Sequence, residues 1–178
     1  MHWSDKIADS IIKKNPNKEE YVCAAGISPS GSIHIGNFRD IATSLFVVKA
    51  LMRKGKKAKL LFSWDEFDRL RKIPVNVQKI DGDMEKYIGY PYVDVPNPFD
   101  DGLDSYAKHF EKEFMDAMDR FGIKMDYRYQ ADMYRSGKYA DKVIESMDKR
   151  GEIFDILDSF RTQNAKEGER EAYYPVSI

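Results

Sequence analysis

Residues 24–37, Ala-Ala-Gly-Ile-Ser-Pro-Ser-Gly-Ser-Ile-His-Ile-Gly-Asn, join an apolar run to a long apolar segment through a turn of Ser, Pro and Gly. The run at 21–27 predicts a buried strand, and the segment at about 33–54 predicts a helix. A strand that leads through a tight turn into a helix start forms an anion site, because the first helical amides lack partners and the helix dipole favours negative charge. The stretch therefore indicates a protein that binds a nucleotide by its phosphates.

The turn and the helix start supply the candidate nucleotide-binding residues. His34 and Asn37 lie three residues apart on one helical face, and both can donate hydrogen bonds to phosphate, so they are the candidate catalytic residues. A single histidine is more often solvated, but the adjoining turn favours a ligand-facing role. Gly31 and Gly36 lack a Cβ atom, which permits a sharp turn and close approach of a bulky ligand. The full candidate set is Pro29, Ser30, Gly31, His34, Gly36 and Asn37.

A second strand is expected at 57–64, and the strand–helix–strand order predicts a right-handed parallel unit. Ligands of open α/β sheets bind outside the carboxyl ends of the strands. Asp65 and Asp68 follow the second strand, so we expect them to face the same crevice as the turn. Either carboxylate can pair with a cationic substrate, or it can instead cap a helix start or pair with Arg69 or Arg71. The residues alone leave both interpretations open.

The remaining segments predict helices around this sheet. Helices are expected at 3–15, 103–121, 138–150 and 152–165, a third strand at 123–130, and a charged turn at 166–170. Prolines and glycines between 73 and 102 predict an excursion with little regular structure. Helix ends are expected at Gly55, Gly122 and Gly151. The fold class is therefore α/β, a Rossmann-like parallel sheet with flanking helices.

Several side chains near these segments have a structural interpretation beside a functional one. The aromatic residues at the strand ends either line the pocket or pack in the core: Trp64, Phe67, Tyr90 and Tyr92. We expect His2 to be a disordered terminal residue and His109 to be solvated on its helix.

Composition narrows the class of protein. At 178 residues and 42% apolar, the chain can form one sizeable core and a small appended element. A net charge of −1 gives no global attraction to nucleic acid, so RNA contacts must come from a local patch. Cys23 is the single cysteine, so no disulfide or Cys-rich zinc site forms within the chain, and no metal site is expected in it. No stretch is long and apolar enough for a membrane span, and residues 1–20 are too charged for a secretory signal, which favours the cytoplasm.

The stretch His34-Ile35-Gly36-Asn37 resembles the HIGH signature of class I aminoacyl-tRNA synthetases. Residues 26–37, together with 62–74, resemble the class I type of lysyl-tRNA synthetase in particular, and the likeness runs on to Tyr173-Tyr174-Pro175-Val176. The resemblance implies ATP with Mg²⁺, lysine and tRNA(Lys) as ligands, and we expect a monomer. It also implies that Gly26 and Ser28 hold the substrate lysine, and it favours Asp65, with Asp68, as amino-acid-binding residues.

By this resemblance the chain is the front of such an enzyme, with an incomplete sheet. Residues 1–151 correspond to the amino-terminal part of the catalytic domain, and 152–178 to the start of a connective insertion. The second signature loop of Lys-Met-Ser-Lys-Ser type has no counterpart in the chain, so we expect it to be inactive alone in full aminoacylation.

Other functions are compatible with the same residues. The chain is alternatively a non-catalytic nucleotide- or tRNA-binding module, another nucleotidyltransferase, or a synthetase for another amino acid such as glutamate. Glutamate would need a cation aimed into the crevice, and Arg39, Arg69 and Arg71 lie near enough in sequence to supply one.

Overall fold

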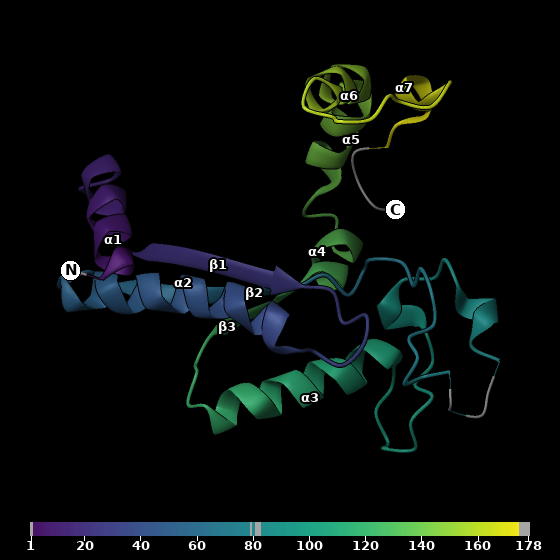
Figure 1. The fold of residues 1–178 in the computed structure, drawn as a ribbon, viewed down its shortest axis with the longest axis horizontal. Coiled ribbons are helices and arrows are strands. Elements are labelled where there is room, and N and C mark those ends of the chain that lie inside the picture. The colour runs from purple at the N-terminus through teal and green to yellow at the C-terminus, as the bar shows by residue number, and fades with distance from the viewer. Residues whose placement is uncertain (1, 79, 81–82, 175–178) are drawn as a thin grey trace. The chain divides into compact units, whose positions relative to one another are not determined.

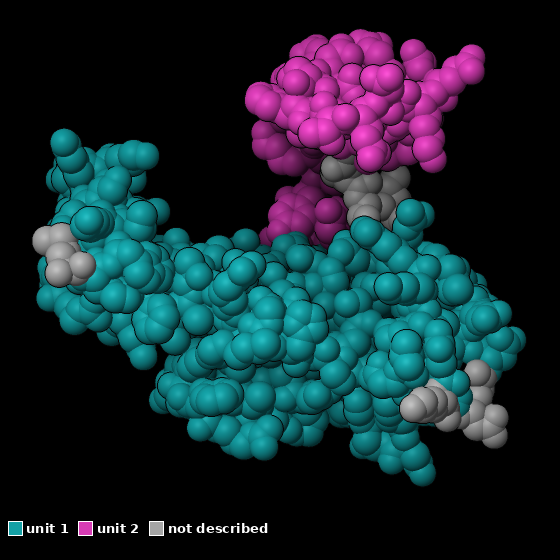
Figure 2. Space-filling model, in the orientation of Figure 1, with its two compact units in different colours: residues 1–130 teal, residues 131–178 magenta. Residues whose placement is uncertain are grey.

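The computed structural model describes residues 2–78, 80 and 83–174. The chain divides into two compact units, residues 1–130 and residues 131–178 (Figure 2). The boundary expected after residue 151 is of another kind, because it separates part of a catalytic domain from the start of an insertion. The division into compact units does not test that boundary, so it stays a prediction. The last residues of that expected insertion, 175–178, lie outside the described residues.

Three parallel strands form the sheet of the first unit, in the order β1-β2-β3 (Figure 1). Their bounds are β1 Tyr21–Ile27, β2 Ala58–Trp64 and β3 Asp126–Tyr129. The strand ends Ile27 and Trp64 are partners in register, as are Trp64 and Tyr129, so the carboxyl ends of all three strands meet at one edge. The α/β class with a parallel sheet is confirmed.

Two helices cover one face of this sheet, α2 (Ile35–Arg53) and α3 (Tyr106–Arg120), and both lie below it in Figure 1. Alternate residues of β2 point into this layer, because successive strand residues face opposite sides. Phe62 and Trp64 are fully buried there, and their rings lie 4.9 Å and 5.2 Å from the ring of Phe114 on α3. This aromatic contact joins the central strand to its helix layer.

Helix α1 (Trp3–Lys14) packs against α2 through a smaller cluster with Ala8 and Leu51. His2 is the N-cap of α1, and its side chain accepts a hydrogen bond from the Ser4 amide, so the expectation of a disordered terminal residue was wrong. The helix begins at Trp3, as expected, but hydrophobic periodicity does not reveal the cap one residue before it.

The excursion between β2 and α3 holds two short 3₁₀ turns, η1 (Glu85–Tyr87) and η2 (Tyr92–Asp94), which confirms the prediction of little regular structure. It has its own apolar core, formed with the start of α3 by Leu70, Val77, Met84, Tyr92, Val95, Tyr106, Ala107 and Phe110. His109 stacks on Phe99 and hydrogen-bonds Asp101, so it is not simply solvated.

The second unit is helical, with α4 (Gln130–Arg135) crossing into it from the first. Its other helices are α5 (Ala140–Asp148), α6 (Arg150–Asp158) and α7 (Glu169–Ala172). Within it, Arg170 of α7 pairs with Asp155 of α6 at 2.7 Å.

Four expectations for the end of the chain were wrong. The helix expected at 152–165 is α6, which already ends at Asp158. Gly151 does not end a helix but lies inside α6, because the break between α5 and α6 falls at Lys149. The charged turn at 166–170 runs into α7, which begins at Glu169. The third strand stops at Tyr129, and α4 was missed because its six residues are too few to show periodicity.

Gly26 generates a prediction about stability. A Cβ atom at Gly26 would lie 2.7 Å from the backbone oxygen of Ser63, its partner in register. Because neither strand can move without disturbing the sheet, we expect Gly26→Ala to lower the free energy of unfolding by about 1–3 kcal/mol in urea titration.

Gly31→Ala is the matched control, since a Cβ there would lie 3.5 Å from Cγ of Pro74, an ordinary contact. We expect its free energy of unfolding to stay within about 0.5 kcal/mol of the parent chain. Equal losses in the two variants would contradict the steric argument.

Candidate functional site

The residues that we expect to bind an amino acid lie together in the structure, at the carboxyl edge of the sheet. Ser28 follows β1, and its hydroxyl donates a hydrogen bond of 2.7 Å to Oδ2 of Asp68. The backbone amide of Asp65 donates to the carbonyl of Ile27 at 3.0 Å. Gly26 lies one residue before Ile27, so the segment after β2 and the end of β1 form one continuous edge.

Asp65 is a half-buried carboxylate with a perturbed acidity. Burial raises its pKa above the ordinary aspartate value, and the negative charge of Asp68 raises it further. Among the described residues, neither aspartate forms an ion pair with Arg69 or Arg71. A partly desolvated carboxylate without a cationic partner favours binding of a positive ligand, because the ligand would supply the missing charge.

His34 and Asn37 cap α2 in this structure. Nδ1 of His34 accepts a hydrogen bond from the Gly36 amide at 3.1 Å, and Oδ1 of Asn37 accepts one from the His34 amide at 3.4 Å. Because Nδ1 is an acceptor, the neutral His34 ring carries its proton on Nε2. That N–H and the Asn37 amide nitrogen remain donors at the start of the helix.

Gly36 is constrained by the histidine beside it. A Cβ atom at Gly36 would lie 2.9 Å from Nδ1 and Cε1 of the His34 ring. A side chain at this position would therefore push the ring out of its capping position. The requirement for glycine here arises from His34 as well as from any ligand above it.

The turn between β1 and α2 is anchored to α3. The Ser30 amide donates to the Ser28 carbonyl at 2.8 Å, which makes the turn tight. The hydroxyl of Tyr106 donates to the Ser30 carbonyl at 2.9 Å, and that of Ser32 donates to Glu113 at 3.2 Å. Sequence reasoning placed Tyr106 only on the apolar face of a helix, and no local signal pointed to its contact 76 residues away.

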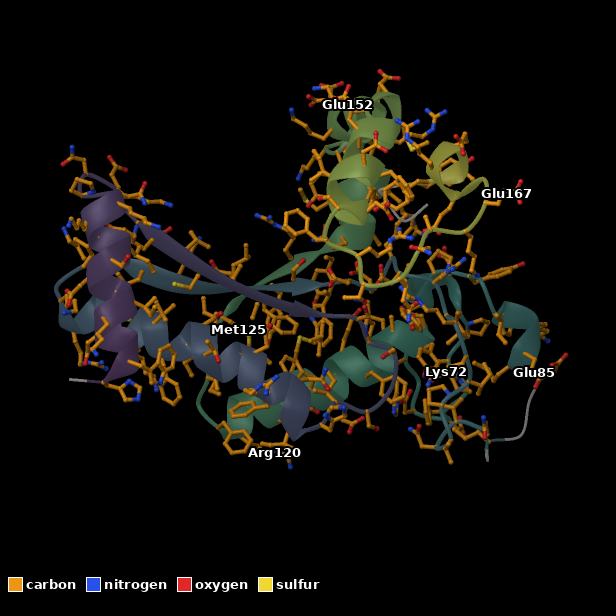
Figure 3. The ribbon with its side chains drawn as sticks, turned by 45° about the horizontal axis from the view of Figure 1, so that its top comes forward. Lys72, Glu85, Arg120, Met125, Glu152 and Glu167 are labelled. Carbon is orange, nitrogen blue, oxygen red and sulfur yellow. The ribbon has the colours of Figure 1, made fainter. Side chains whose placement is uncertain are left out.

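An apolar pocket of about 400 Å³ lies beside His34, between the start of α2 and α3. Arg120, the last residue of α3 and labelled in Figure 3, is one of the residues that line this pocket. The pocket is lined by Ile33, His34, Ile35, Phe38, Glu113, Phe114, Ala117, Met118, Arg120 and Phe121. Apolar walls next to helix-start donors suit a ligand with a flat ring and an anionic group.

Glu66 is a buried carboxylate that sequence reasoning passed over. It lies between the two aspartates, and its Oε2 accepts a hydrogen bond of 3.0 Å from the Gln130 amide at the end of β3. Gln130 in turn donates from its side chain to the Ser63 hydroxyl. These contacts tie the carboxyl ends of β2 and β3 together, so they hold the segment that carries Asp65.

The aromatic candidates divide between core and surface. Trp64 is fully buried, and Tyr92 is 6% exposed in the core of the excursion, stacked on Tyr106. Tyr90 is 52% exposed, and Phe67 is half-buried. For Trp64 and Tyr92 the structure favours packing over a role as pocket walls.

Comparison with known proteins defines the class. The family described as tRNA synthetases class I (K) matches residues 1–178. The match covers the whole chain, including the turn, the His34–Asn37 segment and the two aspartates. The chain belongs to this family of class I tRNA synthetases.

Individual relatives carry a common name. The chain is 42% identical over 178 residues to the lysine–tRNA ligase of Treponema pallidum, 36% identical over 179 residues to that of Pyrococcus horikoshii, and 38% identical over 178 residues to that of Methanococcus maripaludis. Each match covers 100% of this chain but 32–33% of the relative. The chain thus spans about a third of the length of these relatives.

Within residues 2–78, 80 and 83–174, no three His, Cys, Asp or Glu side chains gather in a way that would hold a metal ion. In the same described part of the chain, no helix has the length and apolar character needed to cross a bilayer.

The electrostatics of Asp65 predict a pH dependence of stability. Its pKa is raised on folding, so the protonated form is favoured by the folded state and the ionised form opposes folding. Its stabilising contribution is complete below the unfolded pKa of about 3.8 and is lost as pH rises through the higher folded pKa. We therefore expect Asp65→Asn to be more stable than the parent chain at pH 7, with the advantage shrinking toward pH 4.

Urea titrations between pH 4 and 7.5 would measure this difference. Asp40→Asn, at an exposed position on α2, is the matched control and should follow the parent curve. An Asp65→Asn curve with the parent's pH slope would show that the carboxylate is not held in an unfavourable environment.

Proposed function

We propose that this chain is the amino-terminal part of the catalytic domain of a lysine–tRNA ligase, which activates lysine with ATP and transfers it to tRNA(Lys). The observation that carries the proposal is the meeting of two segments at one sheet edge. The His34–Asn37 helix start offers donors to phosphate, and Asp65 and Asp68 lie within the adjoining segment after β2. Anion donors and carboxylates side by side suit a substrate pair of ATP and a cationic amino acid.

In the activation step, a carboxylate oxygen of lysine bonds to the α-phosphorus of ATP and the bond to pyrophosphate breaks, giving lysyl-adenylate. Little covalent chemistry falls to the protein, so positioning and charge stabilisation dominate. Nε2–H of His34 and the side-chain amide nitrogen of Asn37, at the start of α2, would hold phosphate oxygens. Pro29, Ser30, Gly31 and Gly36 would shape the backbone around the nucleotide.

The amino acid would lie across the ends of β1 and β2. Gly26 and Ser28 would contact its α-amino and carboxylate end, and Asp65, with Asp68, would receive the ε-ammonium group. Ser28 already donates to Asp68, which leaves Asp65 the more available carboxylate. The raised pKa of Asp65 also favours Asp65 as the partner of the ammonium group. The positive charge of the ligand would stabilise the ionised carboxylate, which burial and Asp68 otherwise disfavour.

Mg²⁺ would accompany ATP, supplying charge neutralisation on the phosphates. The described residues offer no ready-made cluster of three ligands, which fits an ion held mainly by phosphate oxygens. The apolar pocket beside His34 would take the adenine ring.

The proposal extends to the rest of the enzyme. Residues 1–151 would belong to the catalytic domain and residues 152–178 to the start of the connective insertion. We propose a cytoplasmic monomer that needs the remaining two thirds of the relatives' length for charging tRNA. The isolated chain should therefore show no aminoacylation, which a charging assay with tRNA(Lys) would test.

Glutamate is the alternative specificity, and it would need a cation in the crevice. Arg39, Arg69 and Arg71 are exposed, and in the described part of the chain none of their side chains forms a hydrogen bond or ion pair with the turn or with the aspartates. Two carboxylates at the edge favour a cationic side chain instead.

Calorimetric titration of the chain with non-hydrolysable lysyl-adenylate and glutamyl-adenylate analogues tests the proposal. We expect the lysyl analogue to bind preferentially, and Asp65→Asn to weaken it by about tenfold or more, because a charge-assisted hydrogen bond is lost. Asp40→Asn should bind like the parent chain.

Preference for the glutamyl analogue would overturn the specificity. Binding of neither analogue, by a chain shown to be folded, would favour a non-catalytic module or a site that needs the remaining length of the relatives.

A further inference from the structure

Tyr106 is a buried polar side chain outside the residues assigned to substrate. It is the first residue of α3, it is 0% exposed, and it packs between Tyr92 and Phe110. Its backbone amide donates to the Val95 carbonyl at 2.8 Å, which fixes the residue at its main chain. Burial raises the pKa of its hydroxyl, which therefore stays protonated and remains a donor.

The acceptor of that hydroxyl lies in the nucleotide turn. Tyr106 donates to the Ser30 carbonyl at 2.9 Å, and Figure 1 shows the connection from β1 to α2 passing beside α3. Pro74 of the excursion lies on the same turn, with Cγ 3.5 Å from where a Cβ of Gly31 would stand. Both the excursion, through Pro74, and α3, through Tyr106, therefore contact the turn.

Holding the Ser30 carbonyl also determines where the next amide points. The peptide bond between Ser30 and Gly31 is trans, so its C=O and N–H point in opposite directions. With the oxygen directed at Tyr106, the Gly31 N–H is directed away from it. That N–H forms no hydrogen bond with any residue in the described part of the chain, and it lies in the turn that leads into α2, whose Gly36 amide is already capped by Nδ1 of His34.

We propose that Tyr106 is a positioning residue, which holds the Ser30 carbonyl inward and so aims the Gly31 N–H at a phosphate of the bound nucleotide. The proposal rests on the nucleotide site proposed above and adds the means by which its backbone donor is oriented. Without the hydroxyl, the Ser30–Gly31 peptide loses its anchor and can rotate, which would place a carbonyl where an anion should bind.

The test compares two tyrosine variants of the same kind. Tyr106→Phe removes only the hydroxyl, and Tyr21→Phe is the matched control. Tyr21 is 2% exposed and also donates to a backbone carbonyl, that of Asn15 at 2.6 Å, at the opposite end of β1. Each variant loses one buried hydroxyl–carbonyl bond, so a merely structural role would affect both alike.

Calorimetry with ATP and with adenosine gives the first readout. We expect Tyr106→Phe to weaken ATP binding by about tenfold, the effect of a hydrogen bond to a charged group, and to leave adenosine binding within about twofold. Tyr21→Phe should change neither. Equal effects of the two variants on ATP, or equal losses of ATP and adenosine in Tyr106→Phe, would overturn the proposal.

The residual dipolar coupling of the Gly31 N–H in weakly aligned, ¹⁵N-labelled chain gives a second readout, which needs no ligand. It should change in Tyr106→Phe and stay at the parent value in Tyr21→Phe. If the parent chain binds neither ATP nor adenosine, the nucleotide site fails and this coupling still decides the orientation. A changed coupling supports the role of Tyr106, and an unchanged one overturns it.

Discussion

The parallel pairing of β1 with β2 is the constraint on which the rest of the structure depends. Ile27 and Trp64 end the two strands in register, so the turn after β1 and the aspartates after β2 emerge side by side. Gly26 permits this approach, because it has no side chain to meet the Ser63 backbone. A slip of one residue would turn every side chain of β1 to the other face of the sheet and separate the two halves of the site.

Around this pairing the chain uses buried polar contacts to hold the edge rigid. Glu66 joins the end of β2 to the end of β3, and the excursion pairs back on the segment after β2 through the backbone of Asp68 and Tyr92. Tyr106 joins the turn after β1 to α3 through its hydrogen bond to the Ser30 carbonyl. Glu66 and Asp68 lie within the stretch 62–74 that carries the family resemblance, whereas Tyr106 lies outside it, so residues beyond the resembling motifs also help to hold the site.

The strands and the long helices were predictable from sequence because their signals are local. The run at 21–27 coincides with β1, and the apolar faces of α2 and α3 repeat with helical spacing. The common edge for the turn and for Asp65 followed from topology alone. What could not be predicted depends on distant partners or on short elements: the contact of Tyr106, the burial of Glu66, and the start of α4 directly after β3. The role of His2 as a cap was equally hidden, since histidine is not among the favoured capping residues.

The packing of Gly36 against the His34 ring also bears on how such a sequence can change over time. A side chain at position 36 meets the imidazole at 2.9 Å, whereas a smaller residue at position 34 would remove that obstacle. The two positions are therefore not independent, and the order of replacement matters. A lineage that loses the histidine first is free to fill position 36 afterwards. One that fills position 36 first places a side chain against an imidazole that is still present, and either order costs the helix start its histidine cap.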